Sequence, residues 1–401
     1  MKIRLKPLEE QVIVITGASS GIGLATAREA ARRGASVVLT ARNKSALKDV
    51  TRRIVAEGGR ATWVAADVAD AEAVEHVAET AIETFGHIDT WVNNASSAIY
   101  GKLWEMDLAD KHRLFEVNFW GMVNGCRAAL PELVRHGGAL INIGSVLSSQ
   151  PIPLLGMYSA TKHAVKAYTD TLRMELEHDE APVSVTLVKP ASINTPFFDH
   201  AKSEMDATPK PAPPVYAPEV VADVILHCAE HPTREIQVGG AGKMMSAMGT
   251  LAQGLTERVF ARTLAGDAQQ DDRPRMGSDN LHEPSDFDGV VHGNYDGHVM
   301  RSSLYTRAKL HPAAAALTAL GVGAVAALGA AALRRRRAAS ADAPADASAL
   351  PGDRFEPGDE GDAPVARDTR EVGVRGRRGR GRGRALSADA EAPRLAGAGG
   401  A

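Results

Sequence analysis

Cysteine is scarce in this sequence, which has 2 cysteines among its 401 residues. Cys126 and Cys228 lack the spacing of a disulfide framework or a metal site, so we interpret both as small buried apolar residues in a reducing compartment. A cluster of histidine, cysteine and carboxylate residues is also lacking, and we expect no metal. Residues 1–10 lack the apolar core of a secretory signal, which favours a cytoplasmic location.

A charge bias of one sign is lacking too, because the formal net charge is −3. This balance gives the whole chain no preference for nucleic acid, and we expect no nucleic-acid partner. The charge is uneven, however, and the stretch Arg375–Arg384 is nearly an Arg-Gly repeat. Such a stretch can bind RNA or an anionic surface, but we favour a charged, disordered tail over residues 334–401, which are rich in Ala, Arg and Gly.

Residues 11–238 alternate between short β-branched runs and segments of helical length. The runs are continuously apolar, which is typical of strands that are covered on both faces. The pattern predicts an α/β fold, a doubly wound parallel sheet of Rossmann type with right-handed crossovers. The predicted strands are Val12–Thr16, Ser36–Thr40, Ala61–Ala65, Thr90–Val92, Ala139–Ile143, Val183–Val188 and Glu235–Val238.

The alternation fades near Gly249, so we predict one domain over residues 1–250. Residues 251–311 contain a stretch rich in Asp, Gly, Pro and Asn, which predicts a linker or arm. Residues 312–333 carry no charge and end at four consecutive arginines, a length that can cross a bilayer although alanine makes it only marginally hydrophobic. We expect membrane association here, as a transmembrane or interfacial helix; a soluble helix packed on a partner is the alternative.

A glycine-rich turn joins the first predicted strand to the first predicted helix, and it reads Thr16-Gly17-Ala18-Ser19-Ser20-Gly21-Ile22-Gly23. Glycine at positions 17, 21 and 23 lets the backbone turn tightly and approach a pyrophosphate. The helix that begins near Ile22 directs its free N–H groups at the phosphates, and Ser19 and Ser20 can add hydroxyl donors. The strand before the turn and the helix after it make this a strong dinucleotide-binding signal.

The second predicted strand ends in Thr40-Ala41-Arg42. An NAD-specific site needs a carboxylate near this point for the ribose 2′-hydroxyl, and the next acid in the chain is Asp49. An arginine instead suits a 2′-phosphate, through charge-assisted hydrogen bonds. We therefore predict NADP(H) as the cofactor and NAD(H) as the less favoured alternative. An exposed arginine without any cofactor role would leave the same pattern.

Four polar residues follow the glycine turn: Asn118, Ser145, Tyr158 and Lys162. Tyr158 and Lys162 are four residues apart, so on a helix they share a face. An ammonium group beside a tyrosine favours the phenolate and lowers the tyrosine pKa from about 10 toward working pH, as acid–base catalysis requires. Taken together with the glycine turn, these residues resemble the short-chain dehydrogenase/reductase family.

The resemblance covers roughly the first 240 residues and implies a role for each of the four. It implies that Tyr158 is the acid–base group and that Lys162 lowers its pKa and holds the nicotinamide ribose. Ser145 would orient the substrate oxygen, and Asn118 would help to bind a water that relays protons. The implied activity is an NADP(H)-dependent interconversion of an alcohol and a carbonyl compound, in a homo-oligomer.

The same resemblance implies further cofactor contacts. Asp67 would bind the adenine amino group with help from the Val68 backbone, although a helix N-cap explains Asp67 equally well. Asn94 lies in the run Asn93-Asn94-Ala95, which the family continues with glycine and this chain with Ser96. The run Pro190–Pro196 resembles another cofactor-contacting motif of the family, in which the implied contacts come from the backbone of Ile193 and from Thr195.

Three segments are expected to border the substrate, namely residues 97–104, 151–157 and 197–216. They predict a largely apolar pocket for a medium-sized alcohol or carbonyl compound. The residues concerned are Ile99, Tyr100, Trp104, Leu154, Leu155, Met157, Phe197 and Phe198. Two alternatives to an enzyme are a non-catalytic regulator that senses a dinucleotide and a scaffold that acts through its tail; the presence of both Tyr158 and Lys162 favours the enzyme.

Overall fold

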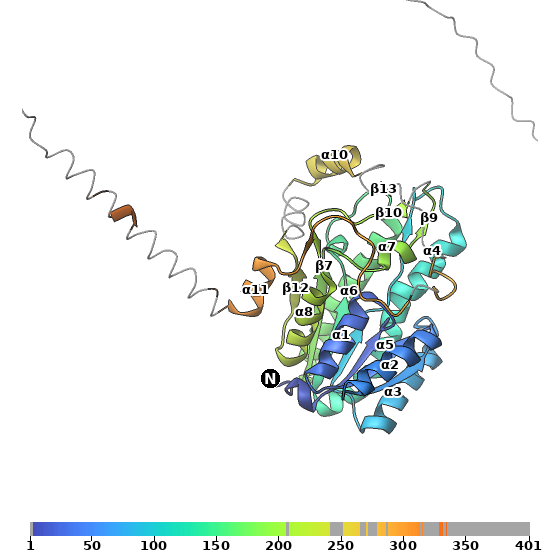
Figure 1. The fold of residues 1–401 in the computed structure, drawn as a ribbon, viewed down its shortest axis with the longest axis vertical. Helices are drawn as coiled ribbons and strands as arrows, with labels where there is room; N and C mark the ends of the chain where they lie inside the picture. The colour runs from blue at the N-terminus through green and yellow to red at the C-terminus, as the bar shows by residue number, and fades with distance from the viewer. Residues whose placement is uncertain are drawn as a thin grey trace, which may run out of the picture. The chain divides into compact units, whose positions relative to one another are not determined.

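The computed structural model describes residues 3–205, 208–240, 252–264, 270–271, 279–285, 288–312, 315, 329–331 and 334. A parallel seven-stranded sheet in the order β12-β7-β6-β4-β1-β2-β3 forms the centre of the fold (Figure 1). The predicted doubly wound α/β fold is therefore confirmed, and each predicted strand lies within an observed one. The strands are β1 (Val12–Thr16), β2 (Ser36–Ala41), β3 (Arg60–Ala65), β4 (Thr90–Asn93), β6 (Gly138–Ile143), β7 (Val183–Pro190) and β12 (Glu235–Val238).

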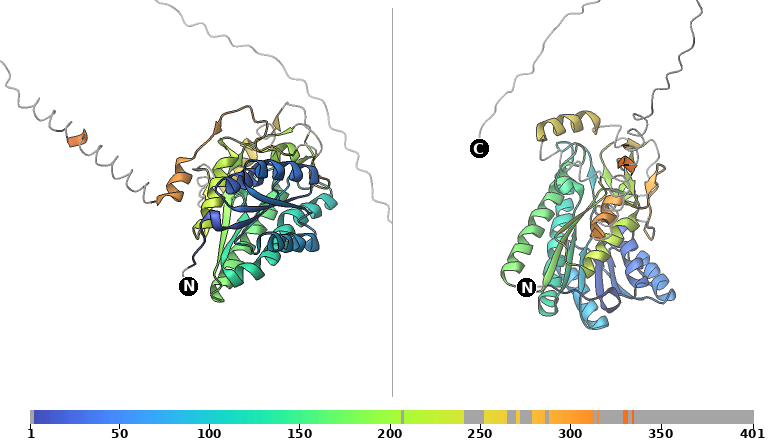
Figure 2. Two further views of the ribbon diagram at one scale, coloured as in Figure 1. Left: turned by 60° about the horizontal axis from the view of Figure 1, so that its bottom comes forward. Right: turned by 90° about the vertical axis from the view of Figure 1, so that its left-hand side faces the viewer.

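Helices cover both faces of the sheet (Figures 1 and 2). One face packs against α1 (Gly21–Arg32), α2 (Lys44–Ala56) and α8 (Pro218–Glu230). The other packs against α3 (Ala71–Phe85), α5 (Gly121–His136) and α6 (Gly156–His178). Between α3 and α5 lie α4 (Leu108–Phe115) and a π-helical turn, Glu116–Trp120.

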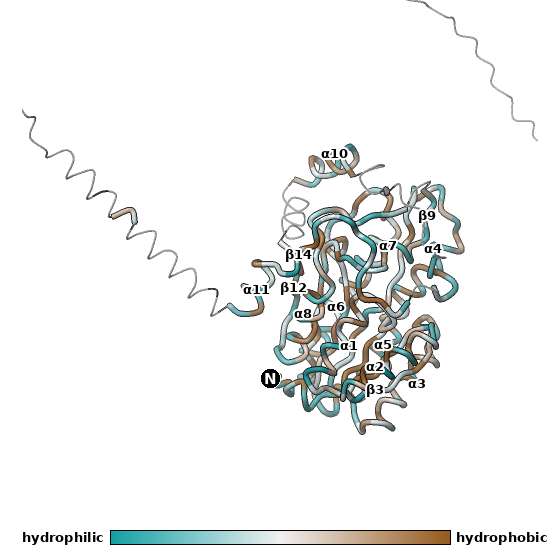
Figure 3. Tube along the Cα trace, viewed as in Figure 1, coloured by the Kyte–Doolittle hydropathy of each residue, from teal (hydrophilic) through white to brown (hydrophobic). Residues whose placement is uncertain are grey.

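The strands are apolar throughout because successive side chains enter two different cores. Ile13 and Ile15 of β1 face the core beneath α1 and α8, whereas Val12 and Val14 face the core beneath α3 and α5. All four are at most 3% exposed. Figure 3 shows the apolar residues gathered in the interior between the layers. Burial on both faces explains why these runs lack the polar alternation of a half-exposed strand.

Capping residues begin three of the helices at positions the sequence specifies. Asn43 accepts the Ala46 N–H at 3.0 Å at the start of α2, and Asp107 accepts an N–H at the start of α4. Asp70 caps α3. The cap of α3 is thus Asp70 and not Asp67, so the helix-cap interpretation of Asp67 is wrong.

The strand order reverses between β1 and β4, and their carboxyl ends open a crevice there. Short elements surround this crevice, at the edge where the strands end (Figure 1). They are β5 (Ile99–Tyr100), the turn Val146–Ser148, β8 (Ser192–Ile193), α7 (Phe197–His200), β9 (Lys202–Ser203), β10 (Thr208–Pro209), β11 (Val215–Tyr216), α10 (Gln253–Thr263) and β13 (Gln270–Asp271).

Residues 251–311 were predicted to form a linker or arm, but their described C-terminal part is packed on the domain. Strand β14 (Val299–Met300) pairs in parallel with β11, and α11 (Leu304–Leu310) follows it. Within α11, the Thr306 hydroxyl accepts the Gly239 N–H at 3.2 Å. This polar, glycine-rich segment combines such hydrogen bonds with a few apolar contacts, those of Leu281, Val299 and Met300, and so few apolar residues give it the composition of a linker.

Most of the predicted helix at 312–333 lies outside the described residues, and so does the predicted tail 334–401 apart from Arg334. Within the part of the chain that is described, no helix combines the length and the apolar content needed to cross a membrane.

Candidate active site

A cavity of about 310 Å³ lies at the carboxyl ends of the strands, at the crevice between β1 and β4. Its wall combines the glycine turn, the end of β2 and the loops after β3, β4, β6 and β7. The predicted site residues that line it are Gly17, Ser19, Ser20, Gly21, Ile22, Arg42, Asp67, Val68, Asn94, Ser145, Tyr158, Lys162, Ile193 and Thr195. The remaining two, Gly23 and Asn118, lie behind this wall and support it.

The glycine turn is packed so closely that side chains would not fit. Gly17 has a φ of +64°, and a Cβ atom on it would lie 2.8 Å from the Cα atom of Ala95. A Cβ atom on Gly23 would lie 2.2 Å from the Gly17 carbonyl oxygen. Asn94 ties β4 to the turn, because its amide donates to the carbonyls of Thr16 at 2.9 Å and Gly17 at 3.2 Å.

Helix α1 begins directly after this turn, and the Ser20 side chain makes no cap hydrogen bond to it. The first N–H groups of a helix have no partner within the helix, and they attract anions. The start of α1 therefore favours an anion on the cavity wall, although its first N–H, that of Gly21, donates to the Val290 carbonyl at 3.0 Å. Thr195 closes the opposite side, since a Cβ atom on Gly21 would lie 3.2 Å from its side chain.

Charged groups gather at the β2 end of the cavity. The Arg42 guanidinium lies 4.0 Å from the Asp67 carboxylate, which also pairs with Arg113. Burial lowers the pKa of Arg42, and the charge of Asp67 opposes that change. The Asp67 carboxylate further accepts the Ala69 N–H at 3.0 Å. Arg42 and Asp67, which the sequence analysis assigned to the 2′-phosphate and the adenine of the cofactor, thus lie together.

Tyr158 and Lys162 share one face of α6, as their spacing predicts. The Lys162 Nζ atom lies 5.6 Å from the centroid of the Tyr158 ring. It donates a hydrogen bond to the Ile143 carbonyl at 2.9 Å. Lys162 is 2% exposed, and this burial lowers the pKa of its ammonium group to about 7. The ammonium group of Lys162 therefore titrates close to neutral pH.

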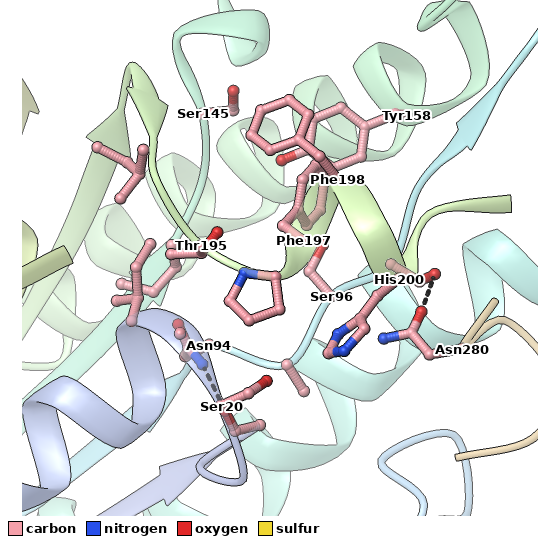
Figure 4. A pocket seen from close by; sticks show the side chains of 18 of the residues that line it. Ser20, Asn94, Ser96, Ser145, Tyr158, Thr195, Phe197, Phe198, His200 and Asn280 are labelled. Carbon is pink, nitrogen blue, oxygen red and sulfur yellow. Dashed lines mark hydrogen bonds between the residues drawn. The ribbon is translucent and has the colours of Figure 1, made fainter. Parts of the chain in front are cut away.

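Two serine side chains, those of Ser145 and Ser96, act on the pKa of the Tyr158 hydroxyl. Burial raises the pKa of Tyr158, and hydrogen bonds with the side chains of Ser145 and Ser96 act in the opposite direction. Figure 4 shows Ser145, Tyr158 and Ser96 around one cavity, with Phe197 and Phe198 beside them. The sequence predicts that Lys162 favours the phenolate, which stays a prediction; the two serine side chains act in the same direction.

Asn118 lies in the π-helical turn before α5 and joins three parts of the site. Its amide donates to the Ser97 carbonyl at 2.9 Å and to the Thr161 hydroxyl at 3.1 Å. Its side-chain oxygen accepts the Ser97 N–H at 2.8 Å and the Ser96 hydroxyl at 3.1 Å. Asn118 thereby fixes the loop after β4 against α6, and π-turns of this kind are frequent at functional sites.

Aromatic rings form the wall next to Tyr158. The Phe197 ring lies 5.5 Å from the Tyr158 ring and 5.6 Å from the Phe198 ring, between centroids. Of the eight predicted pocket residues, Tyr100, Leu155, Phe197 and Phe198 line the cavity. The other four do not: Ile99 is fully buried, Trp104 is 79% exposed, and Leu154 and Met157 lie outside the lining.

The sequence reasoning missed five cavity residues from the C-terminal part of the chain: Leu264, Asn280, Pro284, Ser285 and Asp288. They lie in a stretch whose composition predicts a linker. No local pattern could have identified them, because they are far from the glycine turn in sequence. Ser96 carried a weak signal, since it departs from the glycine of the resembling family.

Comparisons with known proteins agree with this geometry. The family model described as short chain dehydrogenase matches residues 11–206. An uncharacterized oxidoreductase of Bacillus subtilis, YxnA, is 42% identical over 328 residues, which span 80% of this chain and 91% of the relative.

Two solved structures share the fold. One is a short-chain dehydrogenase/reductase from Burkholderia phymatum in complex with NAD, with a TM-score of 0.57 and 27% identity over 62% of this chain and 95% of that one. The other is an alcohol dehydrogenase from Thermococcus sibiricus complexed with 5-hydroxy-NADP, with a TM-score of 0.51 and 29% identity over 57% of this chain and 95% of that one. On these grounds, the chain belongs to the short-chain dehydrogenase/reductase family of oxidoreductases.

Proposed function

We propose that this protein transfers a hydride between a nicotinamide dinucleotide and an alcohol or carbonyl compound, with Tyr158 as the acid–base group. The observation that carries the proposal is one shared cavity, lined by the glycine turn, the start of α1 and the buried Tyr158 hydroxyl. The two solved relatives carry NAD and an NADP derivative, which supports a nicotinamide cofactor here. That cofactor, when bound, supplies or accepts the hydride.

The side chains around Tyr158 suit both directions of the reaction. In carbonyl reduction, Tyr158 donates its proton to the developing alkoxide while the Ser145 hydroxyl hydrogen-bonds the same oxygen. In alcohol oxidation, the Tyr158 phenolate removes the proton, and the hydrogen bonds with Ser145 and Ser96 favour that phenolate. Lys162 adds positive charge when it is protonated and, with a pKa of about 7, can exchange a proton near neutral pH.

The substrate class follows from the wall opposite the cofactor residues. Tyr100, Leu155, Phe197 and Phe198 present aromatic and aliphatic surface to the cavity. We therefore propose apolar ketones, aldehydes or secondary alcohols of medium size rather than sugars. The homo-oligomer implied by the family resemblance stays a prediction.

The preference for NADP(H) rests on Arg42. Its guanidinium is the cation at the end of β2, on the wall of the cavity. A 2′-phosphate gains charge-assisted hydrogen bonds from such a group, whereas the ribose hydroxyl of NAD(H) gains less. Asp67 and the backbone carbonyls of residues 280–283, to which both Nη atoms donate, compete with a 2′-phosphate for this group without removing its positive charge.

The test is NADPH oxidation by the purified full chain across a panel of apolar ketones and aldehydes, with sugars as polar comparators. Tyr158→Phe should lower kcat/KM at least ~100-fold while it leaves nucleotide binding intact. Tyr168→Phe is the matched control, because Tyr168 lies on the same helix and packs on Phe119, away from the cavity. Turnover by Tyr158→Phe at the wild-type rate would contradict the proposal.

A further inference from the structure

A strap from the C-terminal part of the domain crosses the adenosine end of the cavity. We define the strap as its two described pieces, residues 279–285 and 288–293. Both lie beyond residues 11–206, where the family model matches. The strap is therefore an addition to the part of the chain that the family model describes.

The Arg42 guanidinium holds the first piece through its backbone. Its Nη1 atom donates to the carbonyls of Leu281 at 3.3 Å and His282 at 2.8 Å. Its Nη2 atom donates to the carbonyls of Asn280 and, at 3.4 Å, Glu283. Backbone carbonyls converging on one guanidinium form a specific fork that a lysine could not satisfy.

The second piece is bonded to the glycine turn itself. The Gly289 N–H donates to the Ser19 carbonyl at 2.9 Å, and the Gly21 N–H donates to the Val290 carbonyl at 3.0 Å. The Ser19 hydroxyl also donates to the Asp288 carboxylate at 3.1 Å. Two parts of the cofactor wall, the glycine turn and the end of β2, are thus both joined to the strap.

Two side-chain contacts extend these links toward the catalytic end. The Ser97 hydroxyl donates to the Asn280 side chain at 2.7 Å, next to the Asn118 contacts. His282 lies 2.7 Å from the Asp110 carboxylate at the start of α4. Figure 4 shows Asn280 among the side chains of the same cavity.

The strap forms part of the cavity wall and also takes up polar groups of the cofactor wall, namely the Gly21 N–H, the Ser19 hydroxyl and the Nη groups of Arg42. Asn280, Pro284, Ser285 and Asp288 line the same hollow as the glycine turn and Tyr158. A cavity of about 310 Å³ remains between these strap residues, the glycine turn and Tyr158.

We propose that the strap is the outer wall of the dinucleotide site, and that Arg42 is its anchor as well as a cofactor neighbour. A bound dinucleotide is then enclosed between the strap and the carboxyl ends of β1 and β2. It leaves only after the strap contacts break, so cofactor dissociation is slow. This inference rests on the proposed nicotinamide-dependent function.

The roles of anchor and phosphate ligand predict different results with NADH, which has no 2′-phosphate. If Arg42 only bound the 2′-phosphate, Arg42→Ala would weaken NADPH binding and leave NADH unaffected. If Arg42 anchors the strap, NADH dissociates faster as well. A double variant, Asn280→Ala with Asp288→Ala, removes two strap contacts while Arg42 stays in place.

The experiment measures dissociation rates of NADH and NADPH from the full chain by stopped-flow nucleotide fluorescence. Both Arg42→Ala and the double variant should release either nucleotide about tenfold faster than wild type, because each loses at least two hydrogen bonds that close the site. Arg60→Ala is the matched control: Arg60 also donates to two backbone carbonyls, those of Glu9 and Gly34, away from the cavity. Its dissociation rates should equal those of wild type.

Unchanged dissociation of both nucleotides from the double variant, in an enzyme that still turns over, would overturn the strap and leave the proposed function standing. An Arg42→Ala effect confined to NADPH would overturn the anchor role in the same way. A wild-type protein that binds neither nucleotide would overturn the proposed function together with the strap. Thermal unfolding of each variant without nucleotide separates these outcomes from a loss of folding.

Discussion

The Ser96 hydroxyl donates to the side-chain oxygen of Asn118 at 3.1 Å, and the Ser96 side chain also lowers the pKa of Tyr158. In the resembling family a glycine takes the place of Ser96, so this connection between Asn118 and Tyr158 depends on a side chain that the family pattern lacks. A hydroxyl group can rotate between the two partners as Tyr158 gains or loses its proton. Ser96 therefore acts on the acid–base group alongside Lys162 in the proposed mechanism.

Replacing Ser96 should change the pH dependence of alcohol oxidation. The hydrogen bond from Ser96 lowers the pKa of Tyr158, so Ser96→Ala raises that pKa and moves the kcat/KM profile to higher pH by roughly half a unit to one unit. Ser96→Thr keeps the hydroxyl and should keep the wild-type profile. Superimposable profiles for Ser96→Ala and wild type would contradict this role.

Replacing Lys162 should stabilise the protein while it removes activity. Burial lowers the pKa of Lys162 to about 7 from its ordinary value of 10.5, so the unfolded chain holds this proton more tightly than the folded one. Lys162→Met removes the free-energy cost of burying this charge. It should raise the free energy of unfolding at pH 7 by at least about 1 kcal/mol, measured by urea unfolding without nucleotide.

The pH dependence of this effect has a definite sign. Between pH 7 and 10.5 the folded protein has lost the Lys162 proton and the unfolded chain still binds it, so the stability of the wild type gains from rising pH in this window. The advantage of Lys162→Met should therefore shrink from pH 7 to pH 9. A difference between the two proteins that stays constant over this range would contradict the lowered pKa.

Adding one methyl group to the glycine turn should disrupt it. A Cβ atom on Gly23 would lie 2.2 Å from the Gly17 carbonyl and 2.7 Å from the Asn94 amide nitrogen, so Gly23→Ala must displace backbone. We expect a loss of about 2 kcal/mol in stability and a loss of nucleotide binding, measured by thermal unfolding and by fluorescence titration. Gly254→Ala in α10 is the control, because no atom lies within 4 Å of its added Cβ atom.

Shortening the chain should distinguish the predicted domain boundary from the observed one. A fragment 1–312 keeps β14, α11 and the strap, and we expect it to unfold at the temperature of the full chain. A fragment 1–250 loses β14, one of the two strands paired with β11, and the Thr306 contact to Gly239. We expect a loss of about 1 to 2 kcal/mol in stability, which lowers the unfolding midpoint by several degrees. Equal midpoints would support the predicted boundary at 250.

The strands and the glycine turn could be predicted because their signals are local. Ile13 and Val14 are both apolar because each is buried in one of the two cores on either side of the sheet. The turn between β1 and α1 needs glycine at the positions where a Cβ atom would collide with neighbouring backbone. The spacing of Tyr158 and Lys162 is likewise a property of one helix. The apolar wall was only half predicted, because whether Trp104 or Phe198 faces the cavity depends on how separate loops meet.

By itself, the sequence determined the doubly wound sheet, the position of the cofactor turn and the residues available for acid–base chemistry, since periodicity and spacing are written along one segment. Only the tertiary structure decided what surrounds these residues. It brought Asn280 and Asp288 to Arg42 and Ser19, and it placed Ser96 between Asn118 and Tyr158. Such contacts join backbone carbonyls and polar side chains that are far apart in the chain. The stretch that contains Asn280 and Asp288 has, by composition alone, the character of a linker.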